Sequence, residues 1–161
     1  MKTAQLQIRV TPKQKAELRR RARLAGQDLS TYVLTQALPE QSSRFQEILL
    51  AAKDPAQLTF ALASLNDLLA GLGSADLSGA VAAANVAGLS PRVQNTVAAM
   101  VEQACARARI PPPAWTADIE PLDTPWFAGG LKKLRPYLLR VSPLPFRRRN
   151  LFVDASVGDR V

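Results

Sequence analysis

A short stretch of alternating polar and apolar residues near the start of the chain most constrains its fold. If residues 5–10 form a strand, one side of it carries the apolar residues Leu6, Ile8 and Val10. The other side carries the polar residues Gln5, Gln7 and Arg9. This period of two is typical of a half-buried strand. Six residues do not form a stable strand alone, because backbone groups and an apolar face would be left in water. The stretch must therefore pair, and the simplest partner is the same stretch of a second copy.

Two helices are predicted directly after this strand. Thr11 is a good N-cap, Pro12 suits the first helical position, and Gln14 has the spacing of a capping box. Gly26 provides a left-handed stop for the first helix, and a second helix is predicted over residues 28–38. The first forty residues therefore read as strand, helix, tight turn and helix.

Residues 4–39 resemble the ribbon-helix-helix family of DNA-binding proteins, which includes Arc-type and MetJ-type repressors and many antitoxins. The resemblance rests on the alternation in residues 5–10, the Val10-Thr11-Pro12 entry, Gly26 and the run Asp28-Leu29-Ser30-Thr31-Tyr32-Val33. It implies a homodimer whose two strands pair into an intersubunit β-ribbon that enters the major groove of double-stranded operator DNA.

The resemblance implies base reading by Gln5, Gln7 and Arg9. The chemistry is suitable, since glutamine can bind adenine and arginine can bind guanine through two hydrogen bonds each. The alternative is a strand face that is merely exposed to solvent.

The resemblance also implies a phosphate contact at the start of the second helix, where free N–H groups and the helix dipole attract anions. Leu29, Ser30 and Thr31 occupy this place. Asp28 departs from the pattern, because its negative charge lies close to where a phosphate would sit. Lys13, Lys15 and the arginine cluster Arg19–Arg23 are further candidate phosphate contacts, and only some of them can face DNA because they are spread around a helix.

The net charge of +8 is unevenly distributed along the 161 residues. Residues 1–27 carry a net charge of +7 and residues 132–161 a net charge of +6, whereas residues 54–131 carry −4. Basic surfaces attract nucleic acid by neutralising phosphates. An isolated basic run is also compatible with a solvated face, but the strand and helix context of the first 27 residues favours DNA.

Apolar stripes of helical period predict a helical middle domain over residues 40–110. Helices are expected over residues 40–53, from Asp54-Pro55 to about residue 70, over residues 77–86, and from Ser90-Pro91 to the Pro111–Pro113 stop. The predicted fold is mainly α, with the N-terminal module as residues 1–39.

Residues 111–161 are predicted to form an extended, basic, partner-binding tail. A short basic helix interrupted by Pro136 is expected within residues 131–140, a non-helical stretch over residues 142–146, and a short strand near Leu151. Aromatic residues and arginine dominate interface hot spots. The candidate anchors for a cognate toxin are Trp115, Trp126, Phe127, Phe146, Arg147, Arg148, Arg149 and Phe152. Alternatively, the tryptophans pack on the chain's own helices, and the arginines bind RNA or an acidic site.

Enzymatic chemistry has little support, and no catalytic residue, cofactor or metal ligand is expected. The chain has no histidine, and its one cysteine, Cys105, falls on an apolar helical stripe and reads as a buried structural thiol. A lone cysteine fits a reducing cytoplasm. Neither a signal peptide nor an apolar run of about 20 residues is present, so no membrane association is expected.

The sequence therefore predicts an antitoxin of a type II toxin–antitoxin system, which represses its own operon through the N-terminal module and neutralises a toxin through the rest. The tail loosely resembles proteins encoded beside nucleotidyltransferase-type toxins. Two alternatives stay open. One is a relaxosome accessory protein for plasmid mobilisation, since such factors carry the same module; the other is a transcriptional repressor with a ligand-sensing helical domain.

Overall fold

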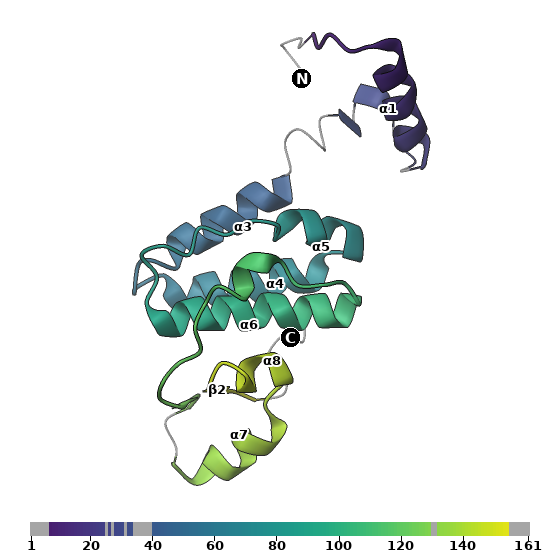
Figure 1. Ribbon diagram of the computed structural model, residues 1–161. Coiled ribbons are helices and arrows are strands. Elements are labelled where there is room, and N and C mark those ends of the chain that lie inside the picture. Colours follow the sequence, from purple (N-terminus) through teal and green to yellow (C-terminus); the bar gives the residue numbers. More distant parts are fainter. Residues whose placement is uncertain are drawn as a thin grey trace. The chain divides into compact units, whose positions relative to one another are not determined.

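The chain forms two compact, mainly helical units, Met1–Glu40 and Gln41–Val161 (Figure 1). The computed structural model describes residues 7–24, 26, 28–30, 32, 33, 40–129 and 132–154. The mainly helical fold class is confirmed.

In the first unit, α1 (Pro12–Leu24) begins with the predicted capping box. The Thr11 backbone N–H donates to Gln14 Oε1 at 2.9 Å, and the Gln14 N–H donates to Thr11 Oγ1 at 3.3 Å. Two N–H groups that the first helical turn leaves without partners are thereby satisfied. Gly26 follows the helix with φ of +65°, the left-handed conformation predicted for the stop.

Residues 7–10 precede α1 without regular secondary structure. Residues 5 and 6 of the predicted strand lie outside the described residues. The predicted ribbon needs a strand from a second chain, so the intersubunit pairing stays a prediction.

In the second unit, four helices surround one apolar core: α3 (Glu40–Ala51), α4 (Leu58–Gly71), α5 (Ser74–Ala80) and α6 (Pro91–Ala108). Phe45, Leu65, Leu77, Val97 and Val101 are almost fully buried and pack together from these four helices. Helix α6 contacts both α4 and α5, which makes it the central helix of the unit.

Two helix positions differ from the prediction. Asp54 does not begin α4; its Oδ1 atom accepts the Ala56 N–H at 2.9 Å, which closes a turn, and the helix starts at Leu58. The third helix of the middle covers residues 74–80 rather than 77–86. Gly73 is the N-cap of this helix, and its carbonyl accepts the Leu77 N–H at 2.8 Å.

Helix α6 has clear ends. The Ser90 side chain accepts the Val93 N–H at 3.4 Å, and Pro91 occupies the first turn, as the sequence predicted. Arg109 ends the helix in a left-handed conformation with φ of +57°. The Ile110 N–H then donates to the Cys105 carbonyl at 3.0 Å, and the prolines from residue 111 prevent continuation.

The segment after residue 110 returns to the helical core instead of forming the predicted extended tail. Its elements are a 3-10 turn (Ala114–Thr116), β1 (Trp126–Phe127), a 3-10 turn (Lys132–Leu134), α7 (Arg135–Val141), α8 (Leu144–Arg147) and β2 (Leu151–Phe152). Helix α8 contacts α6 extensively. The predicted boundary at residue 110 therefore does not divide compact units.

Two prolines that the sequence suggested as helix breakers occupy helix starts. Pro136 is the second residue of α7 and Pro145 the second residue of α8. Proline is tolerated there because the N–H it lacks would have no partner in the first turn. The prediction of a non-helical stretch over residues 142–146 is therefore wrong for residues 144–146, which belong to α8, whereas residues 142 and 143 are non-helical.

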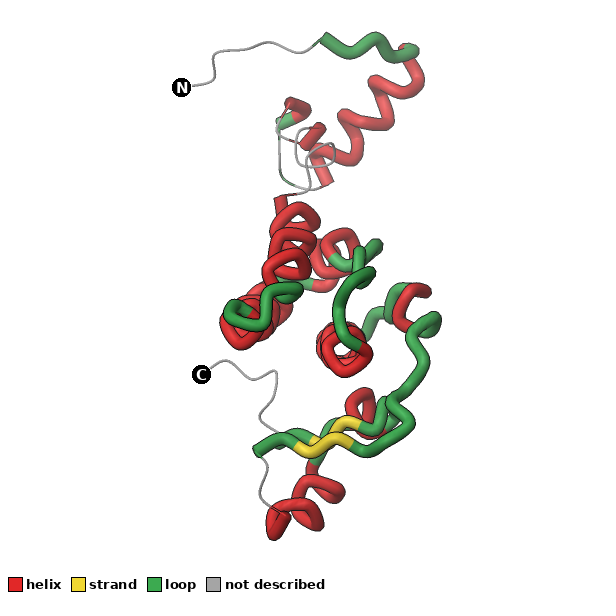
Figure 2. The backbone as a smooth tube through the Cα atoms, turned by 90° about the vertical axis from the view of Figure 1, so that its left-hand side faces the viewer, coloured by secondary structure: helices red, strands yellow, loops and turns green. Residues whose placement is uncertain are grey.

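Strands β1 and β2 pair in parallel, with Trp126 opposite Leu151 and Phe127 opposite Phe152 (Figure 2). Ser142, after α7, is fully hydrogen-bonded: its Oγ contacts the Leu138 carbonyl at 2.6 Å and the Val153 carbonyl at 2.8 Å, and accepts the Val153 N–H at 2.9 Å. Helix α7 is thereby joined to the end of β2.

Candidate nucleic-acid interface

The base-reading candidates lie at the exposed start of the first unit. Gln7 and Arg9 are exposed within residues 7–10, while Gln5 lies outside the described residues. The apolar side of this stretch is also uncovered: Ile8 is 58 % exposed and Val10 42 % exposed. The two described apolar residues of the predicted strand are thus exposed in a single chain, which is compatible with pairing to a second copy.

Helix α1 presents an exposed basic surface. Lys13, Lys15, Arg19 and Arg23 are exposed and form no ion pair within the part of the chain that the structure describes. Their cationic groups are therefore open to phosphates.

Glu17 is the one acidic residue of α1, and it binds two of the helix's arginines. Its carboxylate accepts from Arg20 at 2.9 Å and from Arg21 at 2.8 Å. These hydrogen bonds lower the pKa of Glu17 to about 2 and raise the pKa of both guanidinium groups. Arg20 and Arg21 are thus partly neutralised, which leaves the lysines, Arg19 and Arg23 as the stronger phosphate candidates.

The second predicted phosphate site is occupied by the chain's own carboxylate. Asp28 Oδ1 accepts the Ser30 N–H at 2.9 Å, and the Tyr32 N–H donates to the Asp28 carbonyl at 2.9 Å. Leu29 is half-buried, Ser30 is exposed, and Thr31 lies outside the described residues. A phosphate at Ser30 would compete with Asp28 for the same donor, so we expect the grip to be weaker here than the family resemblance implies.

The predicted toxin anchors divide by accessibility. Phe146, Arg149 and Phe152 are buried within the second unit, so in this conformation they serve its own core and not an exposed partner surface. Arg147 and Arg148 are exposed. Toxin binding by any of these residues stays a prediction.

The remaining three anchors are half-buried and have partners inside the chain. Trp115 donates its Nε1–H to the Val81 carbonyl at 2.9 Å. The Arg92 guanidinium lies 5.2 Å from the Trp126 ring centroid. The Phe127 ring stacks on the Phe152 ring. The tryptophans thus pack against their own unit, which was the alternative left open by the sequence.

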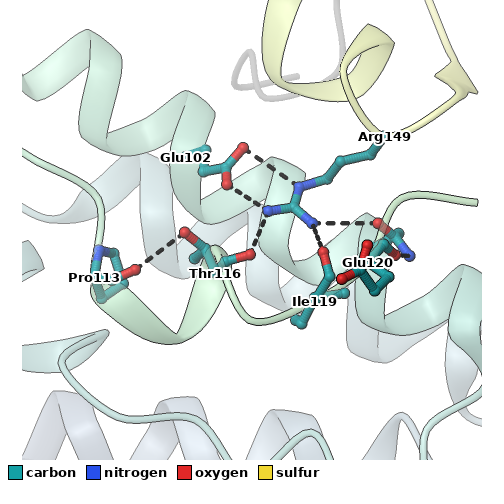
Figure 3. Close-up of polar contacts among 7 residues, drawn as sticks. Glu102, Pro113, Thr116, Ile119, Glu120 and Arg149 are labelled. Carbon is teal, nitrogen blue, oxygen red and sulfur yellow. Dashed lines mark hydrogen bonds and ion pairs between the residues drawn. The ribbon is translucent and has the colours of Figure 1, made fainter.

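Arg149 forms the central polar cluster of the second unit (Figure 3). Its guanidinium donates to Glu102 at 2.5 and 3.4 Å and to the Thr116 carbonyl at 2.6 Å. It also donates at 3.2 Å to both Asn95 Oδ1 and the Ile119 carbonyl. One buried cation therefore joins α6 to the loop of residues 113–120 and to the end of α8.

No short-range signal in the sequence indicated this cluster. Glu102 and Asn95 lie 47 and 54 residues from Arg149 along the chain. The one available hint is that Glu102 is the single acidic residue in α6, directly after the fully buried Val101. Every buried side-chain donor and acceptor among the described residues has a partner, so the arrangement is structural and leaves no unsatisfied group for a ligand.

Other chemistry is sparsely represented in the described residues. Cys105 is a buried free thiol, as predicted, and burial raises its pKa, which keeps it protonated. Within the same residues, no group of three or more His, Cys, Asp or Glu side chains is arranged to hold a metal ion. None of the described helices is both long and apolar enough to span a bilayer.

The chain was compared with known protein families. Residues 1–69 of the 161 match the family described as NikA-like, mobilization protein NikA. The match covers the predicted strand, both helices predicted for the first unit, α3 and most of α4, and it supports a ribbon-helix-helix type of family for this part of the chain. No curated protein and no solved structure matches the chain.

Proposed function

We propose that the chain is a DNA-binding accessory protein of DNA mobilisation, which binds a transfer origin as a dimer and assists the relaxase there. The single observation that carries this proposal is the similarity of residues 1–69 to mobilization protein NikA. The proposal takes up the relaxosome alternative that the sequence left open. The antitoxin hypothesis has no comparable support, because the matched family is described by mobilisation and not by toxin neutralisation.

The surface of the first unit is suited to this role. Arg9 and Gln7 are exposed side chains with the hydrogen-bonding groups that read bases in the major groove. Lys13, Lys15 and the exposed arginines of α1 supply positive charge for the flanking phosphates. Ile8 and Val10 supply the apolar side that a second copy would cover on pairing.

The first test is specific binding to the transfer origin of the element that encodes the chain, measured by fluorescence anisotropy against a scrambled duplex. We expect Arg9→Ala to weaken origin binding by about 1–3 kcal/mol and to reduce the preference over scrambled DNA. Arg44→Ala is the matched control, since it removes an exposed positive charge from α3. Equal effects of both substitutions would contradict base reading by Arg9.

The phosphate contacts have a different signature. Lys13→Ala and Lys15→Ala should weaken origin and scrambled duplexes alike. Each should also lower the slope of log affinity against log salt by about 0.9 for every phosphate that the variant no longer neutralises. A weakening confined to the origin sequence would assign these lysines to base reading instead.

A second test separates the proposal from the antitoxin hypothesis. Purified relaxase should nick the origin faster in the presence of the chain, and the Arg9→Ala variant should lose this stimulation. Conversely, relief of growth arrest caused by a neighbouring gene product, without any effect on nicking, would favour the antitoxin hypothesis.

A further inference from the structure

The second unit carries a concentrated positive charge of its own. Residues 132–153 contain seven Lys or Arg residues and no Asp or Glu. Arg149 is buried against Glu102. The other six are exposed, and we call them the α7–α8 basic surface: Lys132, Lys133, Arg135, Arg140, Arg147 and Arg148.

The charge of the α7–α8 basic surface is not balanced by ion pairs within the part of the second unit that the structure describes. Within the described residues, none of the six forms an ion pair with a carboxylate, in contrast to Arg20 and Arg21 of α1. The first acidic residue after the segment, Asp154, accepts a hydrogen bond from the Tyr137 hydroxyl at 3.1 Å. A short segment that holds six like charges without neutralising them is suited to bind a polyanion.

One of these cations is held in place by stacking. The Arg135 guanidinium lies 5.0 Å from the Phe127 ring centroid, and the Phe127 ring stacks on Phe152 at 4.8 Å between centroids. Phe152 in turn belongs to the buried strand β2. Arg135 is therefore preorganised at the surface, which lowers the conformational entropy that it gives up when it binds a phosphate.

Apolar side chains are also exposed in the same segment, within the 3-10 turn of residues 132–134 and α7. Leu134 is 43 % exposed, and Tyr137 and Leu139 are each 47 % exposed, whereas Leu138 between them is buried. A duplex keeps its bases stacked inside and presents mainly phosphates and sugars outside its grooves, so these side chains would gain little from it. A single strand presents its bases, which stack on aromatic rings while its phosphates follow the basic residues.

We propose that the α7–α8 basic surface binds single-stranded DNA, with phosphates on its lysines and arginines and a base stacked on Tyr137. The inference rests on the proposed function, because a protein that acts where an origin is nicked encounters separated strands. It adds to the duplex-binding first unit a second DNA site of different chemistry in the same chain. When the first unit is bound to DNA, the second site is held close to the same DNA, which raises its effective concentration there.

The test uses the full chain and a labelled oligo-dT of about 20 nucleotides, long enough to span a typical single-strand site, in an anisotropy titration at several salt concentrations. The variant Lys132→Gln/Arg140→Gln/Arg147→Gln removes three charges from the surface. The matched control, Arg44→Gln/Lys53→Gln/Arg109→Gln, removes the same number and kinds of charge from exposed positions elsewhere in the second unit. Circular dichroism checks that both variants are folded.

We expect the surface variant to bind oligo-dT about ten-fold more weakly than the control and to lower the salt slope by about two, at about 0.7 per phosphate for a single strand. Tyr137→Ala should weaken binding to oligo-dT by about five-fold or more. Tyr137→Phe keeps the ring and should bind oligo-dT about as tightly as the wild-type chain. Equal affinities of the surface variant and its control would overturn the proposal. So would tighter binding at this surface to a duplex than to a single strand of the same sequence.

The same protein samples titrated with origin duplex separate the two proposals. If Arg9→Ala weakens origin binding but the surface variant binds oligo-dT as tightly as its control does, this inference alone fails. Suppose instead that the surface variant and Tyr137→Ala both bind oligo-dT more weakly, but the wild-type chain does not prefer origin duplex over scrambled duplex. In that case the proposed function alone fails.

Discussion

The substitution Arg149→Met tests how the second unit is held together. Methionine keeps much of the arginine stem's apolar volume but removes every donor that reaches Glu102, Thr116, Asn95 and Ile119. The Arg149 side chain is 7 % exposed and that of Glu102 19 % exposed, so the pair is largely shielded from water. The size of the destabilisation depends on the buried partner groups that lose their hydrogen-bond donor in the variant.

Breaking a buried ion pair by removing one partner costs about 3–5 kcal/mol, because the other charge stays behind uncompensated. Glu102 is still 19 % exposed, which places the cost towards the lower end of this range, and the Thr116 carbonyl keeps the Ile119 N–H as a donor at 3.4 Å. The Ile119 carbonyl and the Asn95 amide oxygen lose the Arg149 donor, but losses within one cluster do not add in full. We therefore expect a decrease of about 3–4 kcal/mol in the free energy of unfolding. This is a large fraction of the roughly 5–15 kcal/mol typical of a domain.

The assay is urea unfolding followed by circular dichroism and by tryptophan fluorescence, since Trp115 lies in the loop that Arg149 holds. Arg148→Met is the matched control, because Arg148 is the exposed neighbour of Arg149. It should change stability by less than about 0.5 kcal/mol. A decrease below about 1 kcal/mol for Arg149→Met, or equal decreases for both variants, would refute the structural role of the cluster.

Three further outcomes follow from the packing and the ion pairs. Phe146→Ala removes a ring that is 1 % exposed, and it should lower the free energy of unfolding by about 3–5 kcal/mol in the same urea assay. Ser142→Ala leaves the buried Val153 N–H without its acceptor and should cost about 1–3 kcal/mol, with faster amide exchange at Val153 as the diagnostic signal. Glu17 has a folded pKa of about 2 against an ordinary value of 4.5, so its contribution to stability is present above pH 4.5 and is lost as the pH falls towards 2. A carboxyl titration by NMR should show this depressed pKa, and Arg20→Gln/Arg21→Gln should return it towards 4.5; an unchanged pKa in that variant would contradict the role of the two arginines.

The local signals in the sequence predicted local structure well. The Thr11–Gln14 capping box, the left-handed Gly26 and the Ser90-Pro91 helix start each depend on neighbours within a few residues, and each is confirmed. Such features follow from backbone geometry and side-chain length alone.

The path of the chain after residue 110 was not predictable from local signals. The sequence alone does not distinguish Arg149 from its exposed neighbours Arg147 and Arg148. Its burial depends on Glu102, which lies 47 residues earlier in the chain and beside it in the fold. Pro136 and Pro145 read as helix breakers because proline disrupts a helix interior, yet both stand in first turns. Only the tertiary fold distinguishes these cases, since burial and long-range pairing override local propensity.

The base-reading and phosphate-binding roles assigned to the first unit stay predictions. Exposure of Gln7 and Arg9 agrees with the expected reading face, and Asp28 takes the Ser30 N–H that the family resemblance assigned to a phosphate. The predicted strand would pair with a second chain, so the structure of one chain does not test it. Sedimentation is the direct test of this point: we expect a dimer at micromolar concentration, and a folded monomer there would contradict the ribbon.

The most direct test of the central claim is the transfer frequency of a plasmid that carries the cognate origin and relaxase. Transfer should fall when the chain is absent and return when the wild-type chain is supplied. The Arg9→Ala variant should fail to restore it, and Arg44→Ala should restore it fully. Undiminished transfer without the chain would contradict a role in mobilisation.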